Sequence, residues 1–407
     1  MGNIKELKKQ NLMETLAVIH EKGEMTKQEV ARQTGMSAVS AHSFINELLD
    51  KGMLMSGRTE QGNQGRRATL YKLNPYYGFV VGQSLSPAAI TTVSYDFACG
   101  EISAFSLEIG KLGHGELGEA VRQQAAFAIG NHEKSHRRCL GLGFAVPGPM
   151  DSKTQVIRKA MPFIDVNPME LKAQMEEAFS VPVFMGNDNK FNALAIKLME
   201  NRRCRDPLVF VGVREGVGAG VLVEGKILKG ANYLASEVGH IPIQMDGEVC
   251  SCGQRGCLET FIGEKYLIGR IVRHLNENPA SGSASGAALY THQDITMKHV
   301  LAMAEDDAFV KGQLEDACRY LAICLENIVK AYNPEEIVLE CKYLESLPGY
   351  FRKVQDLFFA SPWVRGNEPT LRLNTIPNVW AVGAATAVLD NVFTPAPENI
   401  LGGALEC

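Results

Sequence analysis

One short stretch of the sequence carries an imidazole and three thiols at a spacing that suits a metal ion. These four side chains are His240, Cys250, Cys252 and Cys257. Three thiolates and one imidazole form a closed tetrahedral zinc shell, which fixes structure and leaves no open position for chemistry. Glu237 and Glu259 flank the stretch, and such a shell does not need them. The sequence therefore predicts a structural zinc site with two glutamates left for another role.

Polar residues also follow two predicted strands of the body. Gly148 follows a buried apolar strand at 140–146, and Asn187 and Asp188 follow a second strand at 181–185. In open α/β sheets, ligands bind outside the carboxyl ends of the strands. We therefore expect these three residues to contact a ligand.

Each of these polar residues also has an ordinary structural explanation. Asp188 could cap a helix predicted over 193–200, and Asn187 could be a turn residue. Glu259 could occupy the first turn of a helix, where the helix dipole favours a carboxylate. Because these residues occur in one chain with the metal stretch, we favour ligand binding.

The first 75 residues show the pattern of a DNA-binding module. A helix is predicted over 5–22, with Leu7, Leu12, Leu16 and Ile19 at helical spacing. Thr26 and Glu29 form a capping box for a short second helix that ends at Gly35. Ser37 caps a third helix, Ala38 to Asp50, and two short helices joined by a glycine-containing turn form a helix-turn-helix.

The segment after these helices indicates a wing. Strands are predicted at 53–55 and 70–73, around a glycine-rich loop that contains Arg66 and Arg67. Adjacent arginines on a hairpin suit phosphates or a narrow minor groove. The predicted DNA contacts are the outward-facing start of the third helix and this arginine pair: Ser37, Ala38, Val39, Ser40, His42, Ser43, Arg66 and Arg67.

Residues 76–407 alternate between predicted strands and helices, which indicates a mixed α/β body with two lobes. The first lobe spans 76–200 and is closed by a C-terminal helix at 381–392; the second spans 201–380 and holds the zinc loop and helices for dimerisation. Strands are expected at 79–82, 90–95, 140–146, 181–185, 208–213, 218–223 and 337–340, and helices at 115–131, 169–179, 193–200, 258–276, 310–332 and 381–392.

The composition indicates a cytoplasmic protein without a membrane span. The chain has 407 residues and a net charge of −5, so nucleic-acid contact must come from a local basic patch such as the wing. No apolar run reaches the roughly 18 residues of a membrane helix, and the N-terminus lacks the apolar core of a secretory signal. The ten cysteines are then expected as thiols or metal ligands, not as disulfides.

The chain resembles the ROK family, which groups sugar-responsive repressors with sugar kinases, over essentially all its residues. The motifs that carry the resemblance are Pro147-Gly148-Pro149-Met150-Asp151, Gly186-Asn187-Asp188-Asn189, Gly216 to Gly220, Glu237-Val238-Gly239-His240 and Cys250-x-Cys252-Gly253-x-x-Gly256-Cys257-Leu258-Glu259. The resemblance implies an actin-like, ribonuclease-H-like sugar-kinase fold of two lobes. The N-terminal winged helix-turn-helix is similar to that of the repressor branch.

The resemblance also implies residue roles. His240, Cys250, Cys252 and Cys257 match the zinc ligands, so the imidazole would be shared between metal and ligand. Five side chains match residues that hydrogen-bond sugar hydroxyls: Asn187, Asp188, Glu237, His240 and Glu259. Asp188 also matches the general base of the kinases.

Two departures from the family pattern argue against kinase activity. The kinases carry Asp-x-Gly-Gly-Thr where this chain has Ser84-Leu85-Ser86-Pro87-Ala88, which lacks the carboxylate for the metal-nucleotide and the glycines that approach phosphate. A Gly-Gly-Gly loop is replaced by Glu340-Cys341-Lys342, whose carboxylate repels phosphate. We therefore expect zinc but no nucleotide, with Asp188 as a vestigial base. Family repressors also often carry arginines where Ala38 and Ser43 stand.

These observations predict a non-enzymatic, sugar-responsive regulator, most simply a repressor. Its partners would be operator DNA and a sugar or sugar phosphate effector, and it would act as a homodimer or a dimer of dimers. Two alternatives remain at this point. A transport-system protein could dock on the body and control the regulator in place of a sugar, or the chain could be an active ATP-dependent sugar kinase with an added DNA-binding domain.

Overall fold

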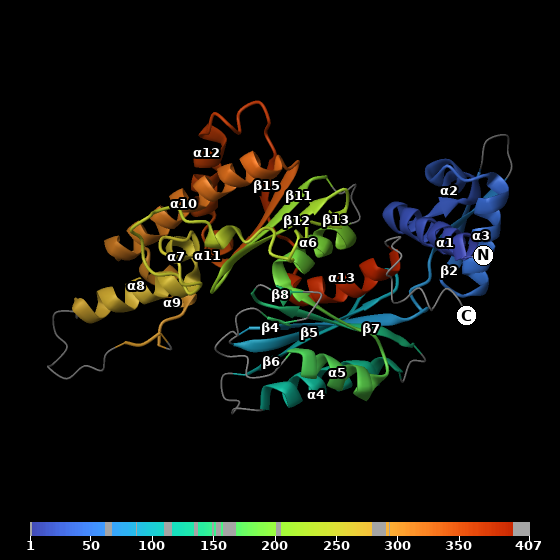
Figure 1. Ribbon diagram of the computed structural model, residues 1–407, viewed down its shortest axis with the longest axis horizontal. Helices are drawn as coiled ribbons and strands as arrows, with labels where there is room; N and C mark the ends of the chain where they lie inside the picture. Colours follow the sequence, from blue (N-terminus) through green and yellow to red (C-terminus); the bar gives the residue numbers. More distant parts are fainter. Residues whose placement is uncertain are drawn as a thin grey trace. The chain divides into compact units, whose positions relative to one another are not determined.

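The structure is a computed structural model that describes residues 2–61, 67–86, 88–109, 116–133, 137–148, 150–151, 156–157, 168–200, 205–278, 290–292 and 294–393. Contacts between residues divide the chain into two units (Figure 1). Unit 1 comprises Met1–Cys204 and Ile376–Cys407, and unit 2 comprises Arg205–Thr375. Each unit is built around one five-stranded sheet. Each is therefore described by itself.

Unit 1 begins with three helices, α1 (Gly2–Lys22), α2 (Lys27–Thr34) and α3 (Ala38–Asp50). The apolar stripe predicted for α1 is confirmed at Leu12, Leu16 and Ile19, which are all buried. It is wrong at Leu7, whose side chain is 56% exposed. Leu7 lies one helical turn before the buried stripe.

The caps predicted for α2 and α3 are confirmed. The Thr26 hydroxyl accepts a hydrogen bond from the Glu29 backbone N–H at 3.2 Å, and the Glu29 carboxylate accepts one from the Thr26 N–H at 2.8 Å. Gly35 ends α2 with a φ of +71°, a conformation that favours glycine, and the Ser37 hydroxyl caps α3. These local bonds set the boundaries of both helices.

A small antiparallel sheet follows the helices and forms the predicted wing. It consists of β1 (Met25–Thr26), β3 (Arg67–Leu73) and β2 (Leu54–Gln61), in that order across the sheet. The tip of the hairpin, with Arg66, lies outside the described residues, whereas Arg67 is the first residue of β3 and is exposed. The hairpin itself is therefore confirmed where it is described.

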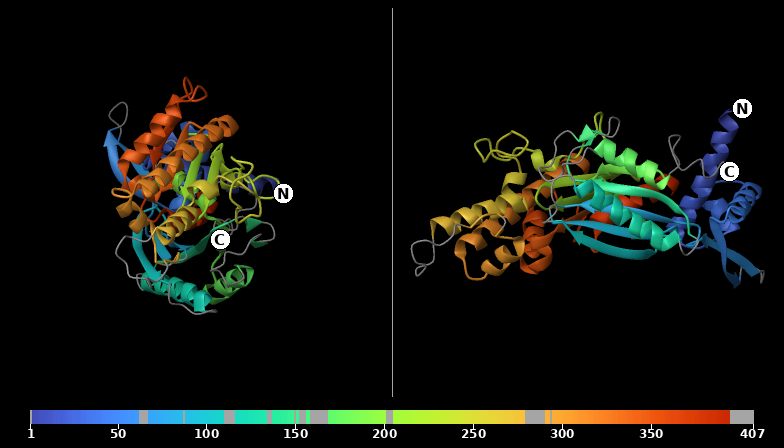
Figure 2. Two further views of the ribbon diagram at one scale, coloured as in Figure 1. Left: turned by 90° about the vertical axis from the view of Figure 1, so that its left-hand side faces the viewer. Right: turned by 90° about the horizontal axis from the view of Figure 1, so that it is seen from below.

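The main sheet of unit 1 has the strand order β10-β7-β4-β5-β6, in which β10, β7 and β4 run parallel. Helices α4 and α5 cover one face, and α6 and α13 cover the other (Figures 1 and 2). The elements are β4 (Phe79–Leu85), β5 (Ala89–Asp96), β6 (Glu101–Glu108), α4 (Glu116–Glu133), β7 (Cys139–Val146), β8 (Met150–Asp151), β9 (Val156–Ile157), α5 (Pro168–Phe179), β10 (Val183–Asn187), α6 (Asp188–Met199) and α13 (Val379–Phe393).

Glycines in the middle strands let α13 lie against this sheet. A Cβ added to Gly143 in β7 would stand 1.8 Å from the Ala384 carbonyl oxygen, and one added to Gly82 in β4 would stand 2.2 Å from that of Ala381. The backbone of the helix thus touches the backbone of the strands. The predicted closing helix is confirmed, and its small residues are what this approach requires.

The sheet of unit 2 has the strand order β13-β12-β11-β14-β15, with β11, β14 and β15 parallel and the first three strands antiparallel. The elements of unit 2 are β11 (Leu208–Val213), β12 (Val217–Val223), β13 (Lys226–Ile227), the 3-10 turn η2 (Val238–His240), α7 (Glu259–Ile262), α8 (Glu264–Glu277), α9 (Met297–Met303), α10 (Ala308–Tyr332), β14 (Glu336–Cys341), α11 (Lys342–Ser346), α12 (Pro348–Ala360) and β15 (Thr370–Leu373).

The sequence predictions hold for the strongly patterned elements and fail at some boundaries. Helix α6 begins at Asp188 and not at Ala193, because the Asn187 side chain caps it. The strands β6 and β15 and the helices α9, α11 and α12 were not predicted. Whether residues 1–75 fold as a domain of their own stays a prediction, since the contacts group them with the first sheet. Within the described residues, no helix is long and apolar enough to cross a membrane.

The contact between α13 and β7 predicts a sharp difference between two glycine substitutions. We expect Gly143→Ala to destabilise the protein by at least about 1–3 kcal/mol, because a methyl group cannot fit against the Ala384 carbonyl. Gly312→Ala is the control: nothing lies within 4 Å of its Cβ position in α10, so it should stabilise the helix by about 0.5–1 kcal/mol. Urea unfolding measures both, and equal effects would contradict the packing described.

Candidate metal centre and ligand contacts

The metal stretch of unit 2 is a compact loop held by its own backbone. The Cys250 N–H donates to the Gln254 carbonyl at 2.8 Å, and the Gly253 N–H donates back to the Cys250 carbonyl at 2.9 Å. Gly253 turns this loop with a φ of +95°. Cys257 pairs with Pro242 in an isolated antiparallel bridge. These bonds return the chain so that the cysteines face His240.

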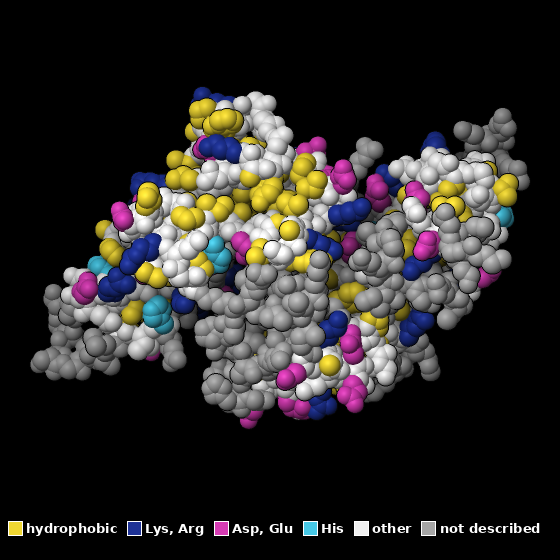
Figure 3. Space-filling model, in the orientation of Figure 1, with side chains coloured by type: hydrophobic (Ala, Val, Ile, Leu, Met, Phe, Trp, Pro, Cys, Tyr) yellow, Lys and Arg dark blue, Asp and Glu magenta, His cyan; other side chains and the backbone are white. Residues whose placement is uncertain are grey.

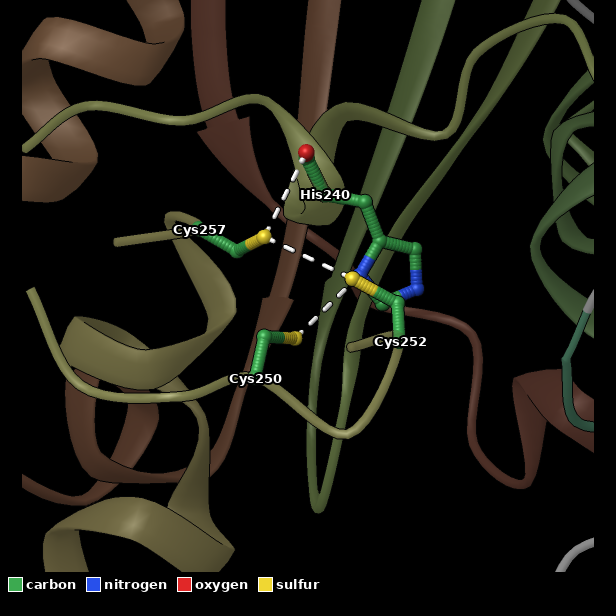
Figure 4. A group of neighbouring side chains, drawn as sticks. All are labelled: His240, Cys250, Cys252 and Cys257. Carbon is green, nitrogen blue, oxygen red and sulfur yellow. Dashed lines mark hydrogen bonds between the residues drawn. The ribbon is translucent and has the colours of Figure 1, made fainter. Parts of the chain in front are cut away.

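The four predicted ligand atoms converge. They all lie within 4.8 Å of one another (Figure 4). The His240 Nδ1 atom is 3.5 Å from the Cys250 Sγ atom, and the Cys252 and Cys257 Sγ atoms are 3.6 Å apart. Metal–sulfur bonds of about 2.3 Å place tetrahedral donors about 3.7 Å apart. A disulfide would need about 2.05 Å, so the spacing fits a metal shell and not a cystine.

Burial favours the protonated form of the buried thiols in the cluster. Burial raises the pKa of the Cys257 thiol to about 12, and burial, with the nearby Glu259 carboxylate, raises the pKa of the Cys250 thiol. Without a cation these thiols hold their protons, and a bound cation would displace the protons. Cys252 is exposed, so it offers the cation a route into the cluster. The cluster can therefore hold a metal ion in a closed shell.

The Glu259 carboxylate is buried beside this shell, with 7% of its residue surface exposed. Its Oε2 atom accepts a hydrogen bond from the Val217 backbone N–H at 3.1 Å, and its Oε1 atom accepts one from the Ser251 hydroxyl at 3.3 Å. The Cys250 thiol lies 3.7 Å from the same Oε1 atom. Glu259 thus connects the metal loop to the turn between β11 and β12.

Tyr266 is a further support of the loop that the sequence did not reveal. Its hydroxyl accepts a hydrogen bond from the Ser251 backbone N–H at 2.8 Å. Tyr266 stands in the first turn of α8, and nothing in its sequence position distinguishes it from an ordinary amphipathic helix residue. Only the fold of the loop shows its contact.

His240 and Glu237 lie at the two ends of the short turn η2. The His240 N–H donates to the Glu237 carbonyl at 3.1 Å, and both side chains are half-buried. With Nδ1 toward Cys250, the other ring nitrogen of His240 lies on the far side of the ring from the sulfur atoms (Figure 4). The imidazole can therefore ligate a metal with one nitrogen and hydrogen-bond with the other.

Unit 1 brings together three of the predicted ligand contacts. Asn187 ends β10 beside the parallel strand β7, and its amide donates to the Gly148 carbonyl at 3.0 Å. The Asn187 side-chain oxygen accepts from the Lys190 N–H at 3.1 Å, so Asn187 is the helix cap, and not Asp188. Asp188 is buried and accepts from the Asn189 N–H at 2.7 Å. A carboxylate and an amide thus stand together at the carboxyl end of the sheet.

The start of α3 presents most of the residues predicted to contact DNA. Ser37, Ala38, Val39, His42 and Ser43 are exposed and Ser40 is half-buried, whereas Ala41, Ile45 and Leu48 are buried.

Lys27 is an addition to this surface that the sequence pattern missed. Its ammonium group donates to the Asn46 side-chain oxygen at 2.8 Å and lies 3.2 Å from the Nδ1 atom of His42. A basic group from α2 therefore covers the middle of α3.

The two segments expected to have lost nucleotide binding are a tight turn between β4 and β5 and the end of β14, which runs directly into α11. Between β4 and β5, the Ser86 N–H donates to the Ala89 carbonyl and the Ala89 N–H donates to the Ser86 hydroxyl, both at 3.0 Å; Pro87 lies outside the described residues. At the end of β14, Glu340 accepts a hydrogen bond from the Asn374 amide at 2.7 Å. Nearby, burial and the Glu215 carboxylate raise the pKa of Glu264 to about 7.

Comparison with known proteins gives matches to one family. A sequence model of the ROK family matches residues 113–360. The xylose repressor of Bacillus subtilis strain 168 is 24% identical over 395 residues, which cover 95% of this chain and 96% of that protein.

Solved structures match the fold. A ROK family transcriptional regulator, described as a homolog of the Escherichia coli MLC protein, superposes with a TM-score of 0.79 at 19% identity and covers 99% of this chain and 100% of its own. A ROK hexokinase from Thermus thermophilus superposes with a TM-score of 0.60 at 24% identity and covers 75% of this chain and 97% of its own. The predicted sugar-kinase fold is thereby confirmed.

The convergence of four donors predicts that the protein binds one divalent ion per chain. We expect Cys250→Ser and Cys257→Ser each to lower the metal content after gel filtration, because each removes a thiolate from the shell. Cys139→Ser, a half-buried cysteine outside the cluster, is the matched control and should leave the metal content unchanged. Elemental mass spectrometry measures all three, and full metal content in the two cluster variants would contradict the assignment.

Proposed function

The chain belongs to the ROK family, and we propose that it is a sugar-responsive, DNA-binding transcriptional repressor without kinase activity. One observation carries the proposal. The alignment with the xylose repressor spans 95% of this chain, whereas the hexokinase covers 75% and leaves about a quarter without a counterpart. The chain therefore resembles a repressor over its whole length and a kinase over its body alone.

The N-terminal part supplies a plausible DNA contact. The caps hold α2 and α3 as a helix pair, and the start of α3 is exposed, where such a helix meets base edges. Arg67 is exposed at the tip end of the β2–β3 hairpin, and Arg66, outside the described residues, precedes it. The proposed contacts with operator DNA are the set predicted from the sequence.

We propose that the protein acts as a homodimer or a dimer of dimers, because a symmetric repressor reads two half-sites about one helical turn apart. An apolar surface of unit 2 supports association. Hydrophobic side chains gather over α10 and β15 (Figure 3). An apolar groove between the metal loop and α10 has Ile241 and Tyr332 in its lining. Ile241 and Ile323 are each 46% exposed.

We propose a sugar or sugar phosphate as the effector. The proposed contacts are the residues predicted from the sequence, namely Gly148, Asn187, Asp188, Glu237, His240 and Glu259. Carboxylates, amides and an imidazole nitrogen suit the dense donors and acceptors of a sugar. An effector that prefers one conformation of the body would shift the population toward it and so change the affinity for DNA.

The proposed metal is a structural zinc ion. Three thiolates and one imidazole are the donors that zinc prefers, and the shell leaves no open position. When bound, the ion would neutralise the thiolates and hold the loop. Metal binding would then fix the orientation of His240 and Glu237, because both belong to the turn η2, which the metal ligand His240 anchors. Loss of zinc should therefore cost effector affinity.

The proposed absence of kinase activity rests on two segments, the turn between β4 and β5 and the end of β14. The β4–β5 turn uses the N–H groups of Ser86 and Ala89 for internal hydrogen bonds and so does not offer them to phosphate. Glu340 places a carboxylate at the end of β14, while the charges around Glu264 are mixed, with Glu215 beside Lys342 and Arg214. We expect no nucleotide cofactor, and Asp188 would be a vestigial base.

The effector proposal predicts thermal stabilisation by a sugar or sugar phosphate. In a thermal-shift screen of these compounds, at least one should raise the melting temperature, because it binds the folded state alone. Calorimetry with that compound should show about tenfold weaker binding for Glu237→Gln, which loses a charge-assisted hydrogen bond. Exposed Glu277 in the same unit gives the control, Glu277→Gln.

Two outcomes would change this view. If no compound in the screen stabilised the protein, a regulator controlled by a docking transport-system protein would become the better explanation. If zinc-stripped protein bound the effector as tightly as the zinc form, the role given to His240 and Glu237 would be wrong.

The loss of nucleotide contacts predicts no phosphoryl transfer. A coupled assay of ATP consumption should show no turnover with hexoses, with or without the effector found by the screen. Restoring the family pattern at 84–88 alone, or at 340–342 alone, should not restore activity, because both segments depart from it. Turnover of any hexose by the natural sequence would overturn the proposal that the chain is not an enzyme.

A further inference from the structure

Helix α3, which we propose contacts the bases, contains no positively charged side chain. Helix α3 reads Ala-Val-Ser-Ala-His-Ser-Phe-Ile-Asn-Glu-Leu-Leu-Asp, without lysine or arginine. Arginine or lysine bonded to guanine O6 and N7 is the commonest specific contact in the major groove. Helix α3 therefore has no side chain that makes this contact.

Most polar groups at the start of α3 are already engaged within the protein. The Ser37 hydroxyl accepts from the Ser40 N–H at 3.1 Å and lies 2.9 Å from the Ser40 hydroxyl. His42 lies 3.2 Å from the Lys27 ammonium group, which also donates to Asn46. These bonds hold the two serines and the histidine in place, so we expect these residues to contact the DNA without reading a base.

One strongly exposed side chain at this end of α3 is apolar. Val39 is 80% exposed, next to exposed Ala38, while the opposite face of the helix is buried through Ala41, Ile45 and Leu48. A valine has one strongly preferred rotamer in a helix, so its methyl groups are held in a defined direction. Val39 contributes little to the core and presents a fixed apolar tip where base edges would lie.

We propose that Val39, assisted by Ala38, contacts the C5-methyl group of thymine in the major groove, so that α3 reads thymine and not guanine. This inference rests on the proposed DNA-binding function and specifies its target. Thymine is the only base that offers a methyl group in the major groove, and apolar side chains recognise it by contact. The exposed Ser43 hydroxyl can accept or donate and adds no strong preference.

The expected effect is modest and measurable. Burying one methyl-sized apolar group changes a dissociation constant by about fourfold. Deoxyuridine differs from thymidine only by this methyl group, so it removes the contact without changing base pairing. A loss of about fourfold in affinity is then expected for each contacted thymine that is replaced.

The experiment uses the full chain and synthetic DNA. Binding sites are first selected from a random duplex library at low salt, and thymines of the selected half-sites are then replaced by deoxyuridine one at a time. The natural sequence should bind the replaced duplex about fourfold more weakly at the contacted position. Val39→Ala should bind thymine DNA more weakly and lose most of the sensitivity to deoxyuridine. Val223→Ala, at another exposed valine in unit 2, should behave like the natural sequence.

The outcomes separate this inference from the function on which it rests. Arg67→Ala should weaken binding to all sequences alike and reduce the slope of log affinity against log salt by about one. If no duplex bound even at low salt, both proposals would fall. If DNA bound with this salt dependence but selection yielded no thymine preference, or deoxyuridine cost nothing, only the thymine contact would be refuted. Unchanged thermal unfolding of Val39→Ala confirms that the variant is folded.

Discussion

Convergence of one imidazole and three thiols within 4.8 Å is the constraint on which the second unit's loop depends. Few apolar side chains of the loop are buried, so packing alone holds it weakly. Hydrogen bonds hold the loop on two sides. Glu259 joins it to the β11–β12 turn, and Tyr266 joins it to α8. A bound cation would complete this set. The loop sets the positions of His240 and Glu237, and therefore the contacts that these two side chains can make with an effector.

In the first unit the corresponding constraint is the close packing of α13 on the sheet. Gly82 and Gly143 remove the side chains that would separate the strands from this helix. Helix α6 lies beside α13, and Asn187 caps it at the end of β10. The carboxylate of Asp188 and the amide of Asn187 are thereby held at the edge of the sheet. Backbone packing thus places the polar groups that the proposed effector would use.

The same fold serves kinases and regulators, so the fold alone does not decide the function. The decision lies in small segments. In the β4–β5 turn the N–H groups of Ser86 and Ala89 bond within the turn, and a carboxylate, Glu340, stands at the end of β14. The residues that we propose as sugar contacts are present in the chain. This combination favours a protein that binds a sugar and reports its presence.

The sequence by itself determined what depends on near neighbours along the chain. The metal ligands lie within one short loop, and the caps at Thr26 and Ser37 involve residues three apart, so spacing was enough. Strongly patterned strands such as β7 and β11 were found for the same reason. The edge strand β6 was missed because none of its side chains is fully buried, although Ile102, Phe105 and Leu107 pack against the core of unit 1.

Only the tertiary structure decided the contacts between distant segments. The bond from Val217 to Glu259 joins residues 42 apart, Lys27 reaches His42 from another helix, and the Asn187 amide reaches the Gly148 carbonyl 39 residues away. These contacts depend on how helices and strands pack, and a shift of one residue would exchange the side chains that meet. Residue types and spacing therefore identified the chemistry, while packing decided which atoms hold it in place.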